Sequence, residues 1–177
     1  MNQDIYNRFA SQIEGREDEK VPGDNGGRTV FGIDEASNPG DVIFALADAA
    51  EAAGRSVATD PDVNARAYAY YSAKWADWDI DYLPAPLQTS VFGACVNEGP
   101  GETFLTLQRC LTEMGQPIKA DGQMGPTTLA AVGKVPTDAL VDKFWRKRVE
   151  FYLTDANKHA SQIKFLLGWE NRVEEGF

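Results

Sequence analysis

Paired start and stop signals for helices are the feature that most limits the fold of this sequence. Asn38-Pro39 and Asp60-Pro61 each combine a residue that favours the N-cap with a proline suited to the first turn, and Gly54 can end the first of these helices. They predict helices over residues 39–53 and 60–77. Apolar spacing and similar signals predict further helices over residues 4–14, 84–97, 103–114, 137–155 and 163–169, with a short one after the turn at Asp121.

One segment departs from this helical patterning. The stretch from Gly15 to Gly32 is polar and rich in glycine, and the order Gly23-Asp24-Asn25-Gly26-Gly27 is typical of a tight turn. The run from Thr29 to Ile33 adds β-branched and aromatic residues, which favour a strand. We therefore predict an α+β fold, mainly α-helical, with a small β-hairpin near residues 23–33.

The charge and hydropathy of the chain argue against two classes of partner. A net charge of −10 over 177 residues does not suit a nucleic-acid-binding protein, which needs a basic face. No apolar run approaches the ~18 residues of a membrane span, so we expect no insertion into a bilayer. The first residues lack the pattern of a signal peptide, so we expect synthesis in the host cytoplasm and delivery to the cell wall by another route.

The cysteines and the histidine form no metal-ligand pattern. Cys95 and Cys110 lie in apolar helical runs, which favours two small buried side chains, and His159 is the single histidine. The turn at Asp121 lacks the alternating acidic ligands of a calcium loop, so a structural turn is the better interpretation. We expect neither a metal nor another cofactor.

Two carboxylates in the polar stretch lie in contrasting environments. Glu14 falls at the end of the first expected helix, where the helix dipole disfavours negative charge and raises the pKa of the carboxyl. Asp24 lies in the glycine-rich turn, whose free N–H groups keep a carboxylate ionised. Glycoside hydrolysis needs such a pair, and the Thr29 hydroxyl can orient a water. A solvated turn between two helices is the alternative interpretation.

Aromatic residues share one face of the helix expected over residues 60–77. Tyr68, Tyr71 and Trp75 recur at helical spacing, and Trp78 and Tyr82 follow. They form either part of the core or a set of platforms for sugar rings, and the sequence leaves both alternatives open.

Three separated motifs resemble one family of enzymes. The pattern E-G-x…D-x-G-G-x-T-x-x-G-I around Glu14 to Ile33 resembles the N-terminal signature of glycoside hydrolase family 108, the lysozyme-like N-acetylmuramidases of phages and bacteria. The run from Val91 to Val132 and the closing run from Phe144 to Val173 resemble the peptidoglycan-binding region that follows in those proteins. The resemblance implies a catalytic region over 1–94 and a helical peptidoglycan-binding region over 95–177, packed as one compact unit.

The resemblance also assigns roles to individual residues. It implies Glu14, Asp24 and Thr29 as the catalytic set. It matches Asp121 to the D-G-x-x-G-x-x-T pattern of peptidoglycan-binding modules, and Asn97 and Gln108 to recurrent polar positions, where packing or capping is as plausible as sugar contact. With Trp75 and Arg16, these three make up the expected substrate-binding residues. Arg16 replaces the second glycine of the family's E-G-G motif. It either pairs with Glu14, lowering the pKa of that carboxyl, or points to solvent or to a substrate carboxylate.

These inferences predict a peptidoglycan hydrolase that acts as a monomer on glycan strands. A lysozyme of this type cleaves the β-1,4 bond between N-acetylmuramic acid and N-acetylglucosamine, with Glu14 as the general acid. Delivery would follow holin release, carriage in a virion or injection. The alternatives are an inactive peptidoglycan-binding or virion structural protein, and a lytic transglycosylase.

Overall fold

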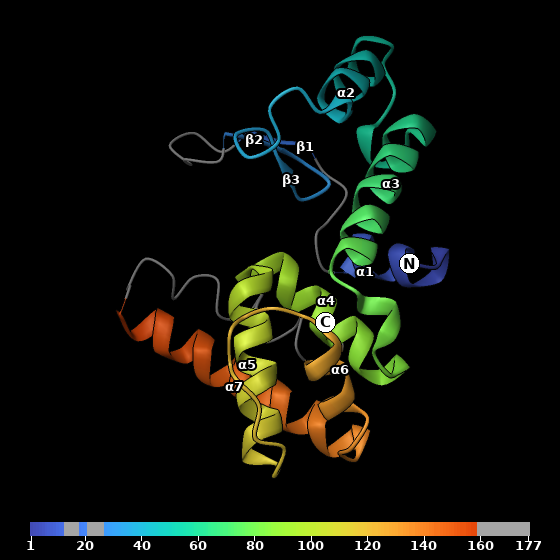
Figure 1. Cartoon of the computed structure of the whole chain (residues 1–177). Coiled ribbons are helices and arrows are strands. Elements are labelled where there is room, and N and C mark those ends of the chain that lie inside the picture. Colours follow the sequence, from blue (N-terminus) through green and yellow to red (C-terminus); the bar gives the residue numbers. More distant parts are fainter. Residues whose placement is uncertain (13–17, 21–26, 159–177) are drawn as a thin grey trace. The chain divides into compact units, whose positions relative to one another are not determined.

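The described part of the chain is mainly helical, as predicted. The computed structural model describes residues 1–12, 18–20 and 27–158, so the helix expected over 163–169 lies outside it. The chain divides into two compact units, Met1–Lys74 and Trp75–Phe177. The elements (Figure 1) are α1 (Gln3–Gln12), β1 (Asp18–Lys20), β2 (Arg28–Val30), β3 (Ile33–Asp34), α2 (Val42–Ala52), the 3₁₀ turn η1 (Val57–Thr59), α3 (Pro61–Asp77), the 3₁₀ turn η2 (Ile80–Tyr82), α4 (Ala85–Glu98), α5 (Pro100–Glu113), α6 (Pro126–Val132) and α7 (Thr137–Lys158).

The β region of the first unit is an antiparallel sheet in the order β1-β2-β3. It begins earlier than the expected hairpin, because Asp18–Lys20, at the end of the charged run, forms a strand that pairs with β2. Val30 and Ile33 pair across β2 and β3, and both side chains are buried in the core of the unit. Alternation along the strand therefore turns Thr29 to the other face of the sheet.

The turn between β2 and β3 places a large residue in an unusual backbone conformation. Phe31 has a φ of 53° and Gly32 a φ of 75°, the signs that a two-residue type I′ hairpin requires. Glycine adopts such angles freely, whereas a phenylalanine there is strained. Burial of the Phe31 ring offsets this strain, and the Tyr71 hydroxyl on α3 donates a 2.8 Å hydrogen bond to the Phe31 carbonyl. Tertiary contacts therefore hold this turn.

Helix α2 starts later than its sequence signal indicates. The expected start at Asn38-Pro39 is wrong: Asp41 is the N-cap, and its carboxylate accepts from the Ile43 N–H at 2.9 Å. The Asn38 side chain is engaged elsewhere, because its amide donates to the Asp34 carbonyl and its oxygen accepts from the Tyr70 hydroxyl.

The other end of α2 is as expected. Gly54 has a φ of 69° and donates to the Glu51 carbonyl, and the next N–H, of Arg55, returns to Ala50. This pair of hydrogen bonds is the glycine-based helix stop that the sequence predicts.

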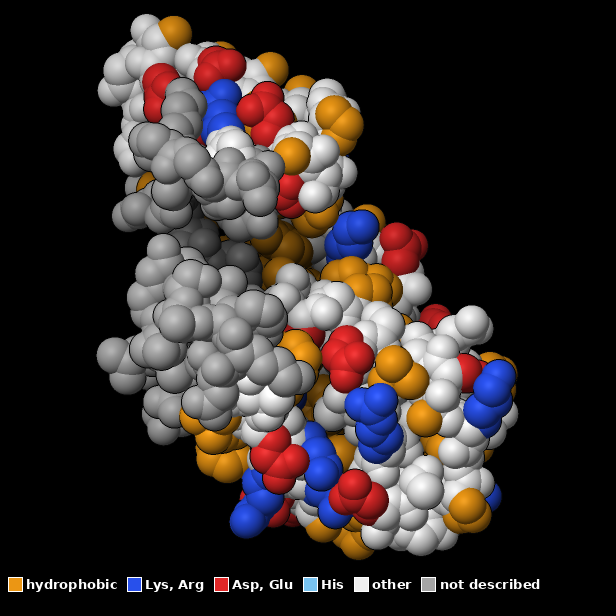
Figure 2. Space-filling model, turned by 90° about the vertical axis from the view of Figure 1, so that its left-hand side faces the viewer, with side chains coloured by type: hydrophobic (Ala, Val, Ile, Leu, Met, Phe, Trp, Pro, Cys, Tyr) orange, Lys and Arg blue, Asp and Glu red, His pale blue; other side chains and the backbone are white. Residues whose placement is uncertain are grey.

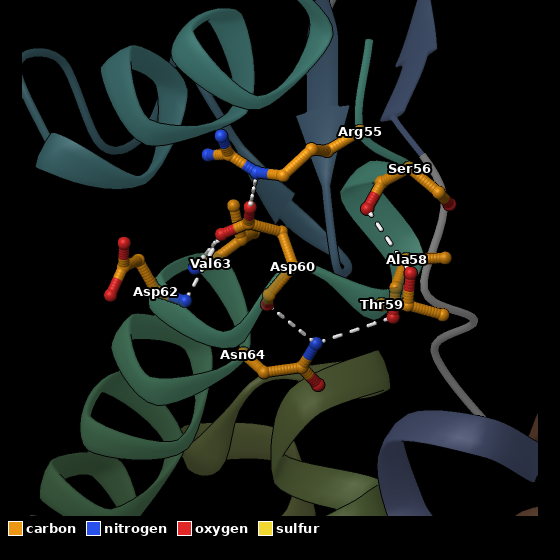
Figure 3. A network of polar contacts seen from close by, with 8 residues as sticks. All are labelled: Arg55, Ser56, Ala58, Thr59, Asp60, Asp62, Val63 and Asn64. Carbon is orange, nitrogen blue, oxygen red and sulfur yellow. Dashed lines mark hydrogen bonds and ion pairs between the residues drawn. The ribbon is translucent and has the colours of Figure 1, made fainter. Parts of the chain in front are cut away.

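The start of α3 confirms the Asp60-Pro61 signal. The Asp60 carboxylate accepts from the N–H groups of Asp62 and Val63 and forms an ion pair with Arg55 at 2.8 Å. Figure 3 shows these contacts together with Asn64, whose amide donates to the Asp60 carbonyl. The guanidinium and the backbone donors lower the pKa of Asp60, so this buried carboxyl stays ionised at the helix start.

Helices α4, α5 and α7 pack against one another in the second unit (Figure 1). Helix α4 contacts α5 and α7 and belongs to the second unit. Inside this bundle Arg148 forms a fully buried ion pair with Glu98 at 2.8 Å and donates to the Tyr152 hydroxyl at 2.9 Å. The sequence has no local signal for this pair, because its members lie 50 residues apart.

Helix α5 begins three residues before its expected start at Thr103. Pro100 occupies its first turn, and the preceding Gly99, with a φ of 83°, separates it from α4. The Thr103 hydroxyl donates to the Gly99 carbonyl at 2.9 Å. The break expected at Gly99–Gly101 is therefore a single residue between two helices.

Candidate active site

The predicted catalytic set is only partly within the described structure. Glu14 and Asp24 lie outside the described residues, as does Arg16 of the expected substrate-binding set, whereas Thr29 occupies the middle of β2. The sheet that carries Thr29 is therefore the part of the candidate site that the described residues include.

Thr29 is held on both sides by the sheet. Its backbone pairs with Glu19 of β1 and with Asp34 of β3, and its side chain is half-buried. Residues directly opposite each other in an antiparallel pair have their Cβ atoms roughly 4.5–5.5 Å apart on one face. Asp34 therefore lies beside Thr29 on the face that does not enter the core.

Asp34 also shapes the segment that follows the sheet. Its carboxylate accepts from the Ser37 N–H at 2.7 Å, and its carbonyl accepts from the Asn38 N–H at 3.2 Å. The Tyr70 hydroxyl donates to the Asn38 side chain at 3.1 Å, and burial, with Asp34 nearby, raises the pKa of Tyr70. These contacts link β3 to α3, and the Asp34 carboxylate caps the backbone of the segment that follows the sheet.

Arg28, the residue before Thr29, is the best-connected side chain of the sheet. Its Nε and Nη2 atoms bind the two carboxylate oxygens of Asp18 on β1, at 2.9 and 2.5 Å. Its Nη1 atom forms a second ion pair with Asp48 on α2 at 2.7 Å. The Asp18 contact is the main reason that the pKa of Arg28 is raised, so the guanidinium remains charged although its side chain is only 10% exposed.

Trp75 is enclosed rather than presented to solvent. The residue is 1% exposed, its ring packs on Phe92 with centroids 5.1 Å apart, and its indole N–H donates to Asp81 at 2.6 Å. A ring in this position has no open face for a sugar, which favours the core alternative. Tyr71 is buried in the same way against Phe9, whereas Tyr82 is 73% exposed.

Gln108 and Asp121, two of the expected binding residues, meet in one hydrogen-bonded network. The Gln108 amide nitrogen donates to the Asp121 carboxylate, the Gln123 carbonyl and the Thr128 hydroxyl at 3.0–3.1 Å. Its amide oxygen accepts from the Asp121 and Gly122 N–H groups at 2.9 and 3.0 Å. The side chain is 1% exposed and its hydrogen-bonding capacity is filled. It therefore clamps the loop between α5 and α6.

Glycine is required inside this loop at one position. Gly122 has a φ of 72°, and a Cβ atom there would lie 3.0 Å from the Gly101 carbonyl oxygen. Asp121 is exposed, and its hydrogen bonds with Gln108 and with the Gln123 N–H lower its pKa. An open hollow of about 330 Å³ lies beside the loop, and Lys119, Asp121 and Thr127 are among the residues that line it.

The remaining polar candidate, Asn97, lies near the C-terminal end of α4, next to Glu98 of the buried ion pair. It is half-buried. The structure therefore brings Gln108 and Asp121 together in one network.

Both cysteines are buried with free thiols. Burial raises the pKa of Cys110 to about 11 and raises that of Cys95 further, so neither thiol is ionised at neutral pH. Among the described residues, no group of three or more His, Cys, Asp or Glu side chains is arranged to hold a metal ion. No helix in this described part has the length and apolar character that crossing a bilayer requires.

Charges on the described surface are mixed in sign. On the face that Figure 2 shows, Lys and Arg side chains lie beside Asp and Glu side chains in small groups. Lys147 illustrates this arrangement, because it contacts Glu113 at 3.6 Å and Glu150 at 3.2 Å. Exposed pairs of this kind stabilise a protein by no more than ~1 kcal/mol each.

Comparisons with known proteins give two family matches in succession along the chain. The model of the family described as glycosyl hydrolase 108 matches residues 8–99, and that of a "Predicted Peptidoglycan domain" matches residues 102–174. No curated protein matches the sequence. Among solved structures, that of Brucella abortus SagA is similar, with a TM-score of 0.68 and 23% identity over 98% of this chain and 89% of that one. At that identity the likeness describes the fold.

Proposed function

The chain belongs to the glycosyl hydrolase 108 family and is a glycoside hydrolase that acts on peptidoglycan, and we propose that it is an N-acetylmuramidase with Glu14 as its general acid. The bond cleaved in this proposal is the β-1,4 link between N-acetylmuramic acid and N-acetylglucosamine. The observation that carries it is the family match over residues 8–99, which spans Glu14, Asp24 and Thr29 together.

The proposed mechanism divides the work among three residues. The Glu14 carboxyl donates a proton to the glycosidic oxygen as the bond to the sugar carbon breaks. The Asp24 carboxylate stabilises the positive charge that develops on the sugar ring or helps to place the attacking water. The Thr29 hydroxyl orients that water, and its position in the middle of a paired strand supports this role, because a fixed backbone limits where the hydroxyl can lie.

The test is product analysis on purified peptidoglycan with wild-type protein and Glu14→Gln. Glu51→Gln serves as the matched control, because Glu51 is an exposed glutamate on α2. We expect wild type and the control to release fragments with a reducing-end N-acetylmuramic acid, and Glu14→Gln to release none. Near-normal turnover by Glu14→Gln would refute the assignment of the acid.

The same experiment separates the alternatives. Fragments that end in a 1,6-anhydro ring identify a lytic transglycosylase. Binding of insoluble peptidoglycan by the wild-type protein without any release identifies a binding or structural protein, an outcome that Arg16 in place of the second glycine of the motif makes worth testing.

For the second unit we propose that the exposed loop after α5 contacts the glycan while Gln108 holds the loop in shape. The match to a peptidoglycan domain over residues 102–174 supports a binding role for this unit. The exposure of Asp121 and the neighbouring hollow favour the loop surface as the contact, whereas the buried Gln108 amide has no hydrogen-bonding group left for a sugar.

A further inference from the structure

Arg28 joins three elements through one side chain. Its guanidinium binds Asp18 with two nitrogen atoms and Asp48 with the third, so it connects β2 to β1 and to α2. The guanidinium carbon also lies 5.8 Å from the centre of the Phe44 ring on α2. All of these residues belong to the first compact unit.

The sheet depends on such contacts because its strands are short. β1 and β2 have three residues each and β3 has two, so few backbone hydrogen bonds define how β2 lies against its neighbours. The Arg28 carbonyl adds one further tie, since it accepts from the Glu35 N–H at 2.9 Å. Residue 28 is thereby held through both its side chain and its backbone.

The residue that follows is Thr29, and its hydroxyl has a role in the proposed reaction. We propose that Arg28 is a positioning residue for that hydroxyl, acting through the two carboxylates that hold β2 against β1 and α2. This inference rests on the proposed function of Thr29 as the group that orients the attacking water. It does not place Arg28 in contact with substrate.

The geometry of the guanidinium suits this task in a way that an ammonium does not. A planar fork can bind both oxygens of one carboxylate and still direct a third nitrogen to another carboxylate. A lysine at the same position keeps the charge but presents a single nitrogen, so it cannot reproduce both the fork and the third contact. Arg28→Lys therefore removes alignment while it preserves charge.

The test is a double-mutant cycle between Arg28→Lys and Thr29→Ala, with kcat and KM measured on solubilised peptidoglycan. Assays run well below the Tm of each variant, and circular dichroism confirms that each is folded. Arg55→Lys is the matched control, because Arg55 also forms a 2.8 Å ion pair with a buried carboxylate of the same unit but binds at the start of α3. Asp48→Asn is a second probe, because Asp48 is 62% exposed and its loss leaves the Asp18 fork intact.

We expect Arg28→Lys to lower kcat by about tenfold with little change in KM, as misplacement of a reacting group does. Arg55→Lys should keep the wild-type kcat. In the Thr29→Ala background the effect of Arg28→Lys, and the smaller effect of Asp48→Asn, should disappear, because the group they position is gone.

Three results would overturn the inference. The first is a folded Arg28→Lys variant with wild-type kcat, and the second is an unchanged Arg28→Lys effect in the Thr29→Ala background. The third is a Thr29→Ala variant with wild-type kcat, since there is then no function to position. That outcome is separate from failure of the proposed function, which is tested by the products that wild type releases and by the activity of Glu14→Gln. Should Arg28→Lys fail to fold, the Asp48→Asn cycle decides the matter by the same criteria.

Discussion

Replacement of Gln108 by leucine distinguishes two roles for this side chain: holding the loop after α5 in shape, or contacting a sugar directly. The two side chains have similar volumes, so the change removes hydrogen bonds without leaving a large cavity. Gln108 makes four contacts with the loop and one with Thr128 of α6, all of 2.9–3.1 Å, through both amide hydrogens and both lone pairs of the oxygen. If it is a clamp, Gln108→Leu destabilises the second unit even when no peptidoglycan is present.

The size of the effect follows from the environment of the partners. The two amide hydrogens and the two oxygen lone pairs each contribute a net ~1 kcal/mol, so their loss lowers the free energy of unfolding by at most ~4 kcal/mol. Part of the loop is exposed and regains water when the clamp is lost, whereas Thr128 is buried and does not. We therefore expect a loss of ~2–4 kcal/mol in the free energy of unfolding, which for a chain of this length lowers Tm by roughly 5–15 °C.

The assay is thermal unfolding by circular dichroism, with Gln88→Leu as the control. Gln88 is a half-buried glutamine whose amide donates to the Leu83 carbonyl at 2.9 Å, so its replacement should cost no more than ~1 kcal/mol. A Gln108→Leu protein with the stability of the control, and with binding of insoluble peptidoglycan lost, would refute the clamp and identify a direct sugar contact.

Gln108→Glu adds a pH dependence with a definite sign. The introduced carboxyl would lie beside the Asp121 carboxylate, in a place that is nearly closed to solvent, and both conditions raise its folded-state pKa above the ordinary value of about 4.3. A raised folded pKa in an acid destabilises the folded state progressively as pH rises above the unfolded value. The stability deficit of Gln108→Glu should therefore be largest near neutral pH and shrink as pH falls toward about 4.

Three further changes test other parts of the structure. Tyr71→Phe removes the hydrogen bond to the Phe31 carbonyl and should lower the free energy of unfolding by ~1 kcal/mol in urea denaturation; no change would show that burial alone holds the turn. Asp60→Asn keeps an N-cap side chain but loses the ion pair. Because the pKa of Asp60 is lowered in the folded state, wild type should be the more stable at neutral pH, and the difference should vanish as pH falls through that pKa. Thr127→Trp should fill the hollow beside the loop and weaken sedimentation with insoluble peptidoglycan, whereas Ala139→Trp, at an exposed position of α7, should not; equal binding by both would exclude the hollow as the contact.

Local sequence signals predicted a helix boundary correctly where the capping residue forms hydrogen bonds with the backbone of its own helix. Asp60-Pro61 and Gly54 perform the roles that their residue types favour. Asn38-Pro39 carries the same type of signal, yet contacts with β3 and α3 occupy the Asn38 side chain, and Asp41 caps the helix instead. A capping residue has several possible partners, and which one it meets depends on the surrounding elements.

The predicted site residues divide in a similar way. Glu14, Asp24 and Thr29 lie in one short stretch of the sequence, so the motif that they form can be recognised without knowledge of the tertiary structure. For Trp75 and Gln108 the sequence left packing and sugar contact open as alternatives, and only the tertiary structure shows that both side chains are enclosed. Exposure is a property of the whole unit, so residue type and spacing do not settle it.

Sequence alone determined the helical class, the small β region and the enzyme family, because periodicity, turn chemistry and motif spacing are local properties of the chain. The tertiary structure decided how distant groups are paired. Arg28 binds carboxylates on two other elements, Phe31 adopts a positive φ supported by α3, and Arg148 meets Glu98 inside a helical bundle. Each of these arrangements requires contacts between residues that are ten to 50 positions apart, and such contacts exist only once the elements have packed.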